Sequence, residues 1–249
     1  MKNTLLIAPH PDDEIVGAFM IIKKILKKKK IIVFFLTNGV IDQNSLWFWQ
    51  KGFHKKMVEN RKKEMKESMK FLGIKKFYLQ NIYTRSLKDN IVKTYNKILK
   101  LKTKYKIDTI FCPAYEGGHQ DHDVANFICS RFVNICKVYE FAEYNYYKNK
   151  IHSNHFFSAS ENDYIIYLTD KEKREKKNFL NVYASEKQNL NYISLEKESF
   201  RELLKYDYKL PPHEGRLFYR RFSFFSWHPR VDSDDPTLIC KKICESKIF

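Results

Sequence analysis

Short apolar runs alternate with longer amphipathic stretches along the first half of the chain. The short runs predict strands, and the stretches with apolar residues three and four positions apart predict helices. The strands are expected at 4–8, 31–36, 76–79, 108–112 and 137–144, and the helices at 14–28, 55–72, 91–105 and 123–135. Strands that alternate with helices imply a parallel sheet with right-handed crossovers. We therefore expect an α/β fold with a Rossmann-like, mostly parallel sheet flanked by helices.

The second half of the chain is less regular. Its patterns predict a strand at 164–168, helices at 171–185 and 195–204, and a strand or extended segment in the aromatic stretch 217–227. No repeat, low-complexity linker or boundary interrupts the chain. We therefore expect a single domain over residues 1–249, with a core at about 1–145 and a C-terminal elaboration at about 146–249.

Two clusters of potential ligands follow predicted strands. Binding sites in such folds lie beyond the carboxyl ends of the strands. The first strand leads into Ala8-Pro9-His10-Pro11-Asp12-Asp13-Glu14, and the strand that ends at Cys112 leads into Glu116-Gly117-Gly118-His119-Gln120-Asp121-His122-Asp123. Because both strands end at the same edge of the sheet, the two clusters are expected to meet in space.

The residue types in these clusters suit a catalytic zinc site. Such sites take three protein ligands and leave a position for water. His10 and Asp13 can supply two ligands and His122 the third, which leaves Asp12 beside the metal as a base. Taken alone, either cluster has a plainer interpretation, because the aspartates suit a helix N-terminus and the histidines suit a solvated loop. Their pairing at matching strand ends favours a metal site, for zinc or another divalent transition metal.

The two clusters resemble the signatures of the PIG-L/LmbE-like N-acetylglucosaminyl deacetylases. The family pattern H-P-D-D-E matches 10–14, and H-x-D-H matches 119–122. The resemblance implies that His119 stabilises the tetrahedral intermediate or assists the leaving amine, and that Asp121 is the carboxylate partner of His119. It covers about the first 145 residues well. Later, Tyr183-Ala184-Ser185-Glu186 looks like the family's Y-x-S-Q without the Gln.

Several further residues are candidates for substrate binding. Arg61 and Glu64 fit the family's R-x-x-E pattern, and Arg61 lies at the edge of an apolar helical stripe. A buried arginine needs a partner, and Glu64, a substrate oxygen or both can serve Arg61. Aromatic residues in the loop after the second strand suit sugar stacking or a loop anchor. The candidates for substrate contact are Arg61, Trp47, Trp49 and His213.

Charge and cysteine content narrow the class of protein. Lys plus Arg is 46 and Asp plus Glu is 29, which gives a net charge of +17. The charge is spread along the chain without a nucleic-acid motif, so we expect solvated lysines and no specific nucleic-acid partner. The five cysteines contain no C-x-x-C pair, which argues against a disulfide framework or a four-cysteine zinc site. No run approaches the ~20 apolar residues of a membrane span or resembles a signal peptide, so the expected location is cytoplasmic.

The sequence and the resemblance together predict zinc-dependent hydrolysis of the N-acetyl group of an N-acetylglucosamine-type sugar conjugate. The expected partner is a small molecule or glycan that bears an N-acetyl amino sugar. One alternative is a metal-dependent amidase that acts on a larger acyl group or on a thiol-sugar conjugate. An alternative of another class is a basic nucleic-acid-binding protein, which would bind DNA or RNA in a salt-dependent way without a metal.

Overall fold

A computed structural model describes residues 3–26, 30–222, 224, 227–232 and 234–248. Its main sheet has the strand order β3-β2-β1-β4-β5-β9-β8. The strands are β1 (Asn3–Ala8), β2 (Lys30–Phe35), β3 (Phe77–Leu79), β4 (Ile107–Pro113), β5 (Lys137–Phe141), β8 (Tyr164–Tyr167) and β9 (Lys197–Glu202). Strands β1 to β5 are parallel, and β9 and β8 extend the sheet antiparallel. The predicted α/β fold with a mostly parallel sheet is confirmed.

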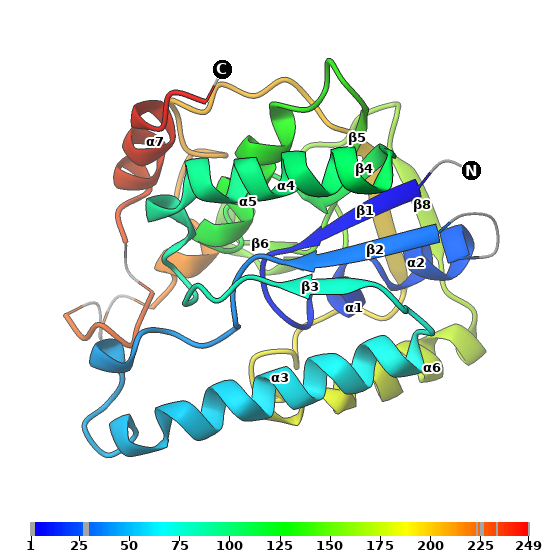
Figure 1. Cartoon of the computed structure of the whole chain (residues 1–249). Coiled ribbons are helices and arrows are strands. Elements are labelled where there is room, and N and C mark those ends of the chain that lie inside the picture. Colours follow the sequence, from blue (N-terminus) through cyan, green and yellow to red (C-terminus); the bar gives the residue numbers. More distant parts are fainter. Residues whose placement is uncertain (1–2, 27–29, 223, 225–226, 233, 249) are drawn as a thin grey trace.

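Helices cover both faces of this sheet (Figure 1). They are α1 (Asp13–Val16), α2 (Phe19–Leu26), α3 (His54–Phe71), α4 (Ile91–Tyr105), α5 (Gln120–Ser130), α6 (Asp170–Val182) and α7 (Pro236–Glu245). The alternation along β1 separates two cores, because Leu5 and Ile7 pack with α4, α5 and α7, whereas Leu6 and Ala8 pack with α1, α2, α3 and α6. Both faces of β1 are therefore buried, as its continuous apolar run predicts.

Three of the expected elements differ from the structure. The helix predicted at 14–28 is interrupted at Gly17, where a Cβ atom would lie 2.5 Å from the ring of Phe141. The helix predicted at 195–204 is wrong, because 197–202 form strand β9. Its charged residues favour a helix locally, but Glu198 and Arg201 are buried in ion pairs with Lys176 and Glu140. These tertiary pairs override local propensity.

The aromatic stretch 217–227 also differs from the expectation of a strand or extended segment. Its residues Phe218–Arg220 form a 3-10 helix, and 223 and 225–226 lie outside the described residues. The C-terminal helix α7 begins with Pro236 and is capped by Asp235, whose side chain accepts the amide of Thr237. It was not predicted, although Cys240 and Cys244 have helical spacing.

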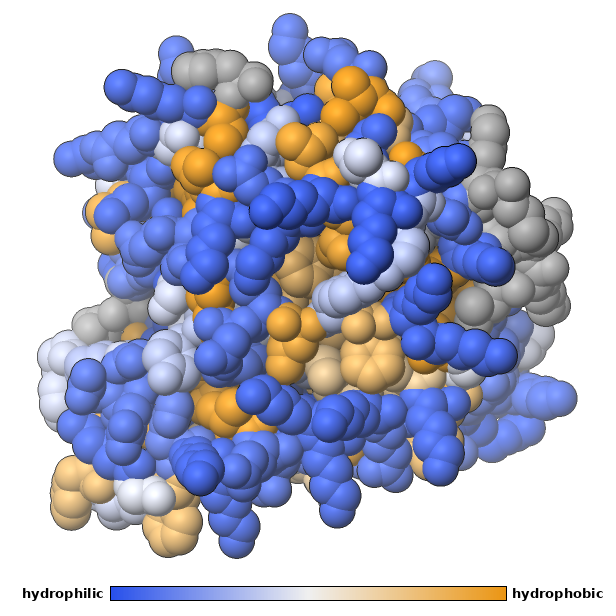
Figure 2. Space-filling view, viewed as in Figure 1, coloured by the Kyte–Doolittle hydropathy of each residue, from blue (hydrophilic) through white to orange (hydrophobic). Residues whose placement is uncertain are grey.

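Hydrophilic side chains cover most of the face drawn in Figure 2, with apolar residues exposed in smaller groups between them. This fits the expectation that the excess lysines are solvated. No helix among the described residues is long and apolar enough to cross a membrane.

Candidate metal centre and active site

The turn between β1 and α1 carries the first ligand cluster. Asp12 adopts a φ of 137°, a conformation that is rare for residues other than glycine and that functional sites often retain. Its side chain makes no capping hydrogen bond to α1, so the plain interpretation of Asp12 as a helix cap finds no support. Asp13 folds back instead, and its Oδ2 accepts the amide of His10 at 2.7 Å. The turn thereby holds His10 and Asp13 together.

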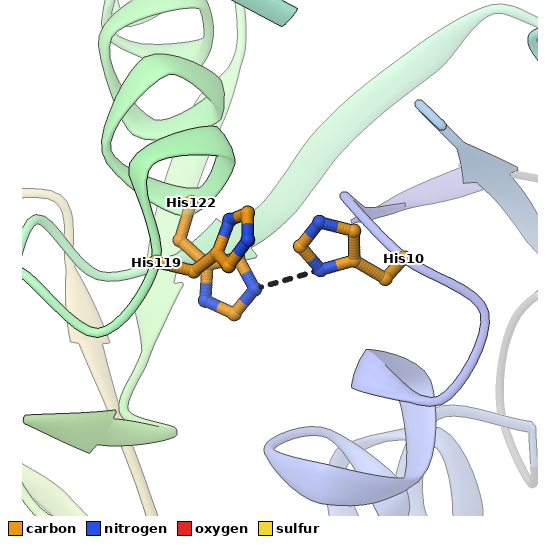
Figure 3. A group of neighbouring side chains, drawn as sticks. All are labelled: His10, His119 and His122. Carbon is orange, nitrogen blue, oxygen red and sulfur yellow. Dashed lines mark hydrogen bonds between the residues drawn. The ribbon is translucent and has the colours of Figure 1, made fainter. Parts of the chain in front are cut away.

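His122 reaches the same place from the first turn of α5 (Figure 3). Its Nε2 lies 3.2 Å from Nδ1 of His10 and 3.4 Å from Oδ1 of Asp13. Nδ1 of His10 lies 3.4 Å from Oδ2 of Asp13. Tetrahedral zinc with bonds of about 2.0–2.1 Å separates its ligands by about 3.3 Å. The three predicted ligands therefore fit a single zinc-class ion.

The electrostatics of this triad also favour a cation. Burial acts to lower the pKa of His10, but the negative charges of Asp13 and Asp121 outweigh it and raise the pKa to about 10. Burial acts to raise the pKa of Asp13, but His122 and His10 hold it well below the usual range. The site thus stabilises positive charge next to its carboxylates, as a metal centre must.

A carboxylate behind the ligands holds His10 in place. Oδ2 of Asp121 lies 3.0 Å from Nε2 of His10 and also accepts the amide of Arg85, while its Oδ1 accepts the amide of Leu87. Burial would raise the pKa of Asp121, but the bond to His10 and nearby positive charge lower it to about 2. An ionised Asp121 fixes the proton of His10 on Nε2 and leaves Nδ1 for a metal.

The carboxylate of Asp121, expected beside His119, lies closer to His10. The Nδ1 of His119 lies 3.8 Å from Oδ2 of Asp121 but already accepts the Asp121 amide at 3.0 Å, so it has no proton to donate there. The other ring nitrogen, Nε2, lies 3.5 Å from Oδ2 of Asp232. Burial, together with the charge of His10, lowers the pKa of His119 well below its usual value. His119 is therefore neutral, with its proton on Nε2.

Asp232 is a site residue that the sequence did not reveal. The pattern at 232–235 suggests a surface acidic turn, but the Asp232 side chain is only 12% exposed. Its Oδ1 accepts the side-chain amide of Gln120 at 2.7 Å, and Arg85 lies 3.6 Å from Oδ2. Burial raises its pKa to about 6. No local signal distinguishes this aspartate from a solvated one, because the contacts that bury it come from distant segments.

Asp12 pairs with Arg61 rather than with a metal ligand. Nη2 of Arg61 donates to Oδ2 of Asp12 at 3.1 Å, and both side chains are buried. Burial raises the pKa of Asp12 well above its ordinary value, although the charge of Arg61 opposes the change. Arg61 also lies 3.6 Å from Glu186. Glu64, the alternative partner expected from sequence, binds the amide and hydroxyl of Ser185 instead.

His10, Asp12 and Asp13 line a pocket of about 780 Å³. Distant segments line it, including Arg61, His119, the turn 184–190, Phe218 and Asp232. The residues Trp47, Trp49 and His213, which were candidates for substrate contact, do not line this pocket. Trp47 stacks between Trp49 and His228, with ring centroids 5.1 and 3.3 Å away. His213 is buried against Tyr147 and Phe157.

The fold matches that of known proteins. No curated protein matches the chain in sequence. A deacetylase from the teicoplanin biosynthesis pathway is 12% identical, with a TM-score of 0.64 over 83% of this chain and 99% of that one. The A40926 pseudoaglycone deacetylase Dbv21 is 12% identical, with a TM-score of 0.62 over 82% and 98%. The N,N'-diacetylchitobiose deacetylase from Pyrococcus horikoshii is 21% identical, with a TM-score of 0.58 over 85% and 84%. At such identities these likenesses show the fold.

The model of one family, described as PIG-L, GlcNAc-PI de-N-acetylase, matches residues 5–133. This span holds both ligand clusters and the strands that carry them. It ends before the turn 184–186 and before Asp232, which complete the pocket. The chain belongs to the PIG-L family.

Proposed function

We propose that the chain is a metal-dependent N-deacetylase that hydrolyses the N-acetyl group of an N-acetylglucosamine-type sugar conjugate, giving acetate and a free amino sugar. The observation that carries this proposal is the convergence of His10, Asp13 and His122 at 3.2–3.4 Å, with Asp12 at the same turn. Membership of the PIG-L family and a fold shared with sugar and glycopeptide deacetylases support it.

We further propose that His10, Asp13 and His122 hold zinc or another divalent transition metal. Such an ion would supply a Lewis acid for the amide carbonyl and would lower the pKa of water. Asp121 keeps His10 in the tautomer that leaves Nδ1 for the ion. These residues supply neutral imidazole nitrogens and a carboxylate oxygen, the donors that zinc takes in catalytic sites.

Asp12 is the proposed general base. Its carboxylate is held by Arg61, and its raised pKa suits proton transfer near neutral pH. It takes the proton of the attacking water and can return it to the departing amine. His119 is the proposed oxyanion donor, because its Nε2–H lines the pocket and lies too far from Asp232, at 3.5 Å, to be held in a strong hydrogen bond.

The C-terminal residues act in the same unit under this proposal. The turn 184–186 anchors Arg61 through Glu186, and Asp232 faces His119. We therefore propose that residues 1–249 form one functional domain, in which the part after about 145 completes the pocket.

The test is release of free amine from a panel of N-acetylated sugars by the zinc-loaded protein. The panel contains methyl N-acetylglucosaminide, N,N'-diacetylchitobiose and N-acetylglucosamine 1-phosphate, with N-butyryl analogues to detect an amidase for larger acyl groups. We expect amine from at least one N-acetyl compound, with release abolished by a chelator and reduced at least about a hundredfold by Asp12→Asn. Release that persists in full with Asp12→Asn and with chelator would refute the proposal.

A further inference from the structure

The wall of the pocket is enriched in arginine. The chain has 9 arginines and 37 lysines, which together make its 46 basic residues. Among the described residues that line the pocket are four of the arginines but one of the lysines, Lys187. The arginines are Arg61, Arg85, Arg221 and Arg230. A planar guanidinium suits two-point binding of carboxylate or phosphate oxygens, whereas lysine suits a solvated surface. The general excess of positive charge does not account for this selection.

Two of these arginines already have carboxylate partners. Arg61 pairs with Asp12 and Glu186, and Arg85 lies 3.6 Å from Asp232. The other two, Arg221 and Arg230, lie within 4.0 Å of no carboxylate in the part of the chain that the structure describes. Both belong to the segment after 133, outside the match to the PIG-L family. They are therefore a property of this chain's own pocket.

Arg221 is half-buried in the wall of the pocket. Its guanidinium lies 3.6 Å from the ring centroid of Phe218 and 4.3 Å from that of Phe222, and its Nη1 donates to the carbonyl of Phe218. Phe218 packs on Tyr144, which packs on His122. This chain of aromatic contacts links the pocket-lining cation to His122. A half-buried cation with one neutral hydrogen-bond partner has free donors for a ligand.

Arg230 is half-buried on a backbone held by Arg85. Nη1 and Nη2 of Arg85 donate to the carbonyls of Pro229 and Arg230 at 2.9 and 2.7 Å. Burial lowers the pKa of Arg230, and the charge of Arg85 lowers it further. The charge of Glu186 raises the pKa of Arg230, but Glu186 already pairs with Arg61 at 3.6 Å. Arg85 has Asp232 as its carboxylate partner, whereas Arg230 has no carboxylate within 4.0 Å among the described residues. A bound anion would stabilise the charge of Arg230.

We propose that Arg221 and Arg230 recognise an anionic group, a phosphate or carboxylate, carried on the sugar conjugate beside its N-acetylated sugar. This inference rests on the proposed deacetylase function and names the class of its substrate. The pocket of about 780 Å³ falls within the range of about 300–1,000 Å³ typical of sites for drug-sized ligands, which leaves room for more than one sugar ring. The wall arginines would then bind the remote part of the substrate and orient the amide at the metal centre.

The test compares substrates that differ in charge. They are methyl N-acetylglucosaminide, which is neutral, N-acetylglucosamine 1-phosphate and carboxymethyl N-acetylglucosaminide. We expect kcat/KM for one of the anionic compounds to exceed that for the neutral one by at least about tenfold, since hydrogen bonds to charged groups are worth roughly that factor or more. The two anionic compounds distinguish phosphate from carboxylate recognition. The preference should weaken as salt is added.

The variants Arg221→Gln and Arg230→Gln should each reduce this preference, and the double variant should remove it. Arg216→Gln is the matched control, because Arg216 is exposed, does not line the pocket and carries the same charge. It should leave the preference unchanged. Equal turnover of neutral and anionic substrates, with no effect of either substitution, would refute the anion site and leave the deacetylase proposal standing.

Failure of the deacetylase proposal gives a different result. No substrate would then release amine, but calorimetry can still measure binding of N-acetylglucosamine 1-phosphate. Binding that is lost in the double variant and kept in Arg216→Gln would support the anion site alone. Binding that is absent, or unchanged in the double variant, would refute it.

Discussion

Nδ1 of His122 lies 3.5 Å from Oε2 of Glu143, and both side chains are buried, at 1% and 0% exposure. Neither carboxylate oxygen of Glu143 has a hydrogen bond among the described residues. The opposite ring nitrogen of His122 faces His10 and Asp13. Glu143 thus faces the outer ring nitrogen of His122, as Asp121 faces the outer ring nitrogen of His10. A carboxylate in this position orients the ring and raises the basicity of the nitrogen that binds the metal.

We predict that Glu143→Gln lowers zinc affinity by about tenfold to a hundredfold. Burial and the charge of Asp13 raise the pKa of Glu143 well above its ordinary value. A bound cation would favour the ionised carboxylate. Glutamine keeps the shape of the side chain but cannot supply that carboxylate to the Nδ1–H of His122. Competition with a chelating dye measures the affinity. Glu198→Gln is a matched control, because Glu198 is equally buried but pairs with Lys176, far along the chain from the triad. Wild-type affinity in Glu143→Gln, or an equal loss in both variants, would contradict the assignment.

A second prediction separates His122 from His119. Both rings lie near His10, with centroids 5.1 and 4.4 Å away, and either could complete a set of ligands. His119 uses Nδ1 to accept the amide of Asp121 and has its proton on Nε2, so it offers no lone pair to a metal. We therefore expect His122→Ala to lose bound zinc and His119→Ala to keep about one ion per chain. Elemental analysis measures the zinc content of the two purified variants. Zinc that is lost in His119→Ala but kept in His122→Ala would show that His119, and not His122, is the ligand.

The strands of the parallel sheet, and the meeting of the two clusters of potential ligands at one of its edges, could be predicted from sequence because their signals are local. A strand buried on both faces, such as β2, is apolar throughout, and a parallel sheet brings the ends of β1 and β4 to one edge. The approach of His122 to within 3.2 Å of His10 and 3.4 Å of Asp13 is a finding of the structure. The PIG-L family resemblance rests on the same short segments.

The remaining features depend on contacts between distant segments. Glu198 and Arg201 have the residue types of a solvated helix and become a buried strand through partners elsewhere in the chain. The family resemblance gives Asp121 as the partner of His119, whereas in the structure its Oδ2 lies 3.0 Å from Nε2 of His10 and its amide donates to His119. Asp232 lies 110 residues after His122 with no pattern to join them. Sequence alone gives no access to such pairings.

Glu116 provides a prediction about pH and stability. It is 2% exposed, and burial raises its pKa from 4.5 to about 7, although the Glu143 amide and the side chain of Asn145 donate to it. Between these two values the unfolded chain is ionised while the folded protein keeps the proton. The unfolding free energy should therefore fall as pH rises from about 4.5 to 7, by about 3 kcal/mol from this group.

Glu116→Gln should remove that part of the decline, because an amide does not titrate and keeps one acceptor oxygen. Urea unfolding of the metal-free protein at several pH values measures the unfolding free energy of wild type and variant. The control is Glu67→Gln, on the surface of α3. The prediction is wrong if the difference in unfolding free energy between wild type and Glu116→Gln is the same at pH 7 as at pH 5. The carboxyl of Glu116 would then be ionised in the folded protein at both pH values.

The last prediction concerns Asp12, which lies next to a proposed ligand and is paired with Arg61 at 3.1 Å. Two roles predict different results for Asp12→Asn. If Asp12 only caps the helix, Asp12→Asn should cost about 1 kcal/mol of stability or less and should change turnover little. A general base would make it cost about 10²- to 10⁴-fold in kcat, since the amide cannot accept the proton of the attacking water.

We expect the second result, with full zinc content, because Asp12 makes no capping bond to α1 and is not one of the three converging ligands. Asparagine is nearly isosteric and can still accept from Arg61, so the pocket should keep its shape. Asp13→Asn is the contrasting variant, because it weakens a ligand and should lose zinc and activity together. Measuring kcat and zinc content on the best substrate of the panel separates the two aspartates. Near wild-type turnover by fully zinc-loaded Asp12→Asn would assign the base to another residue.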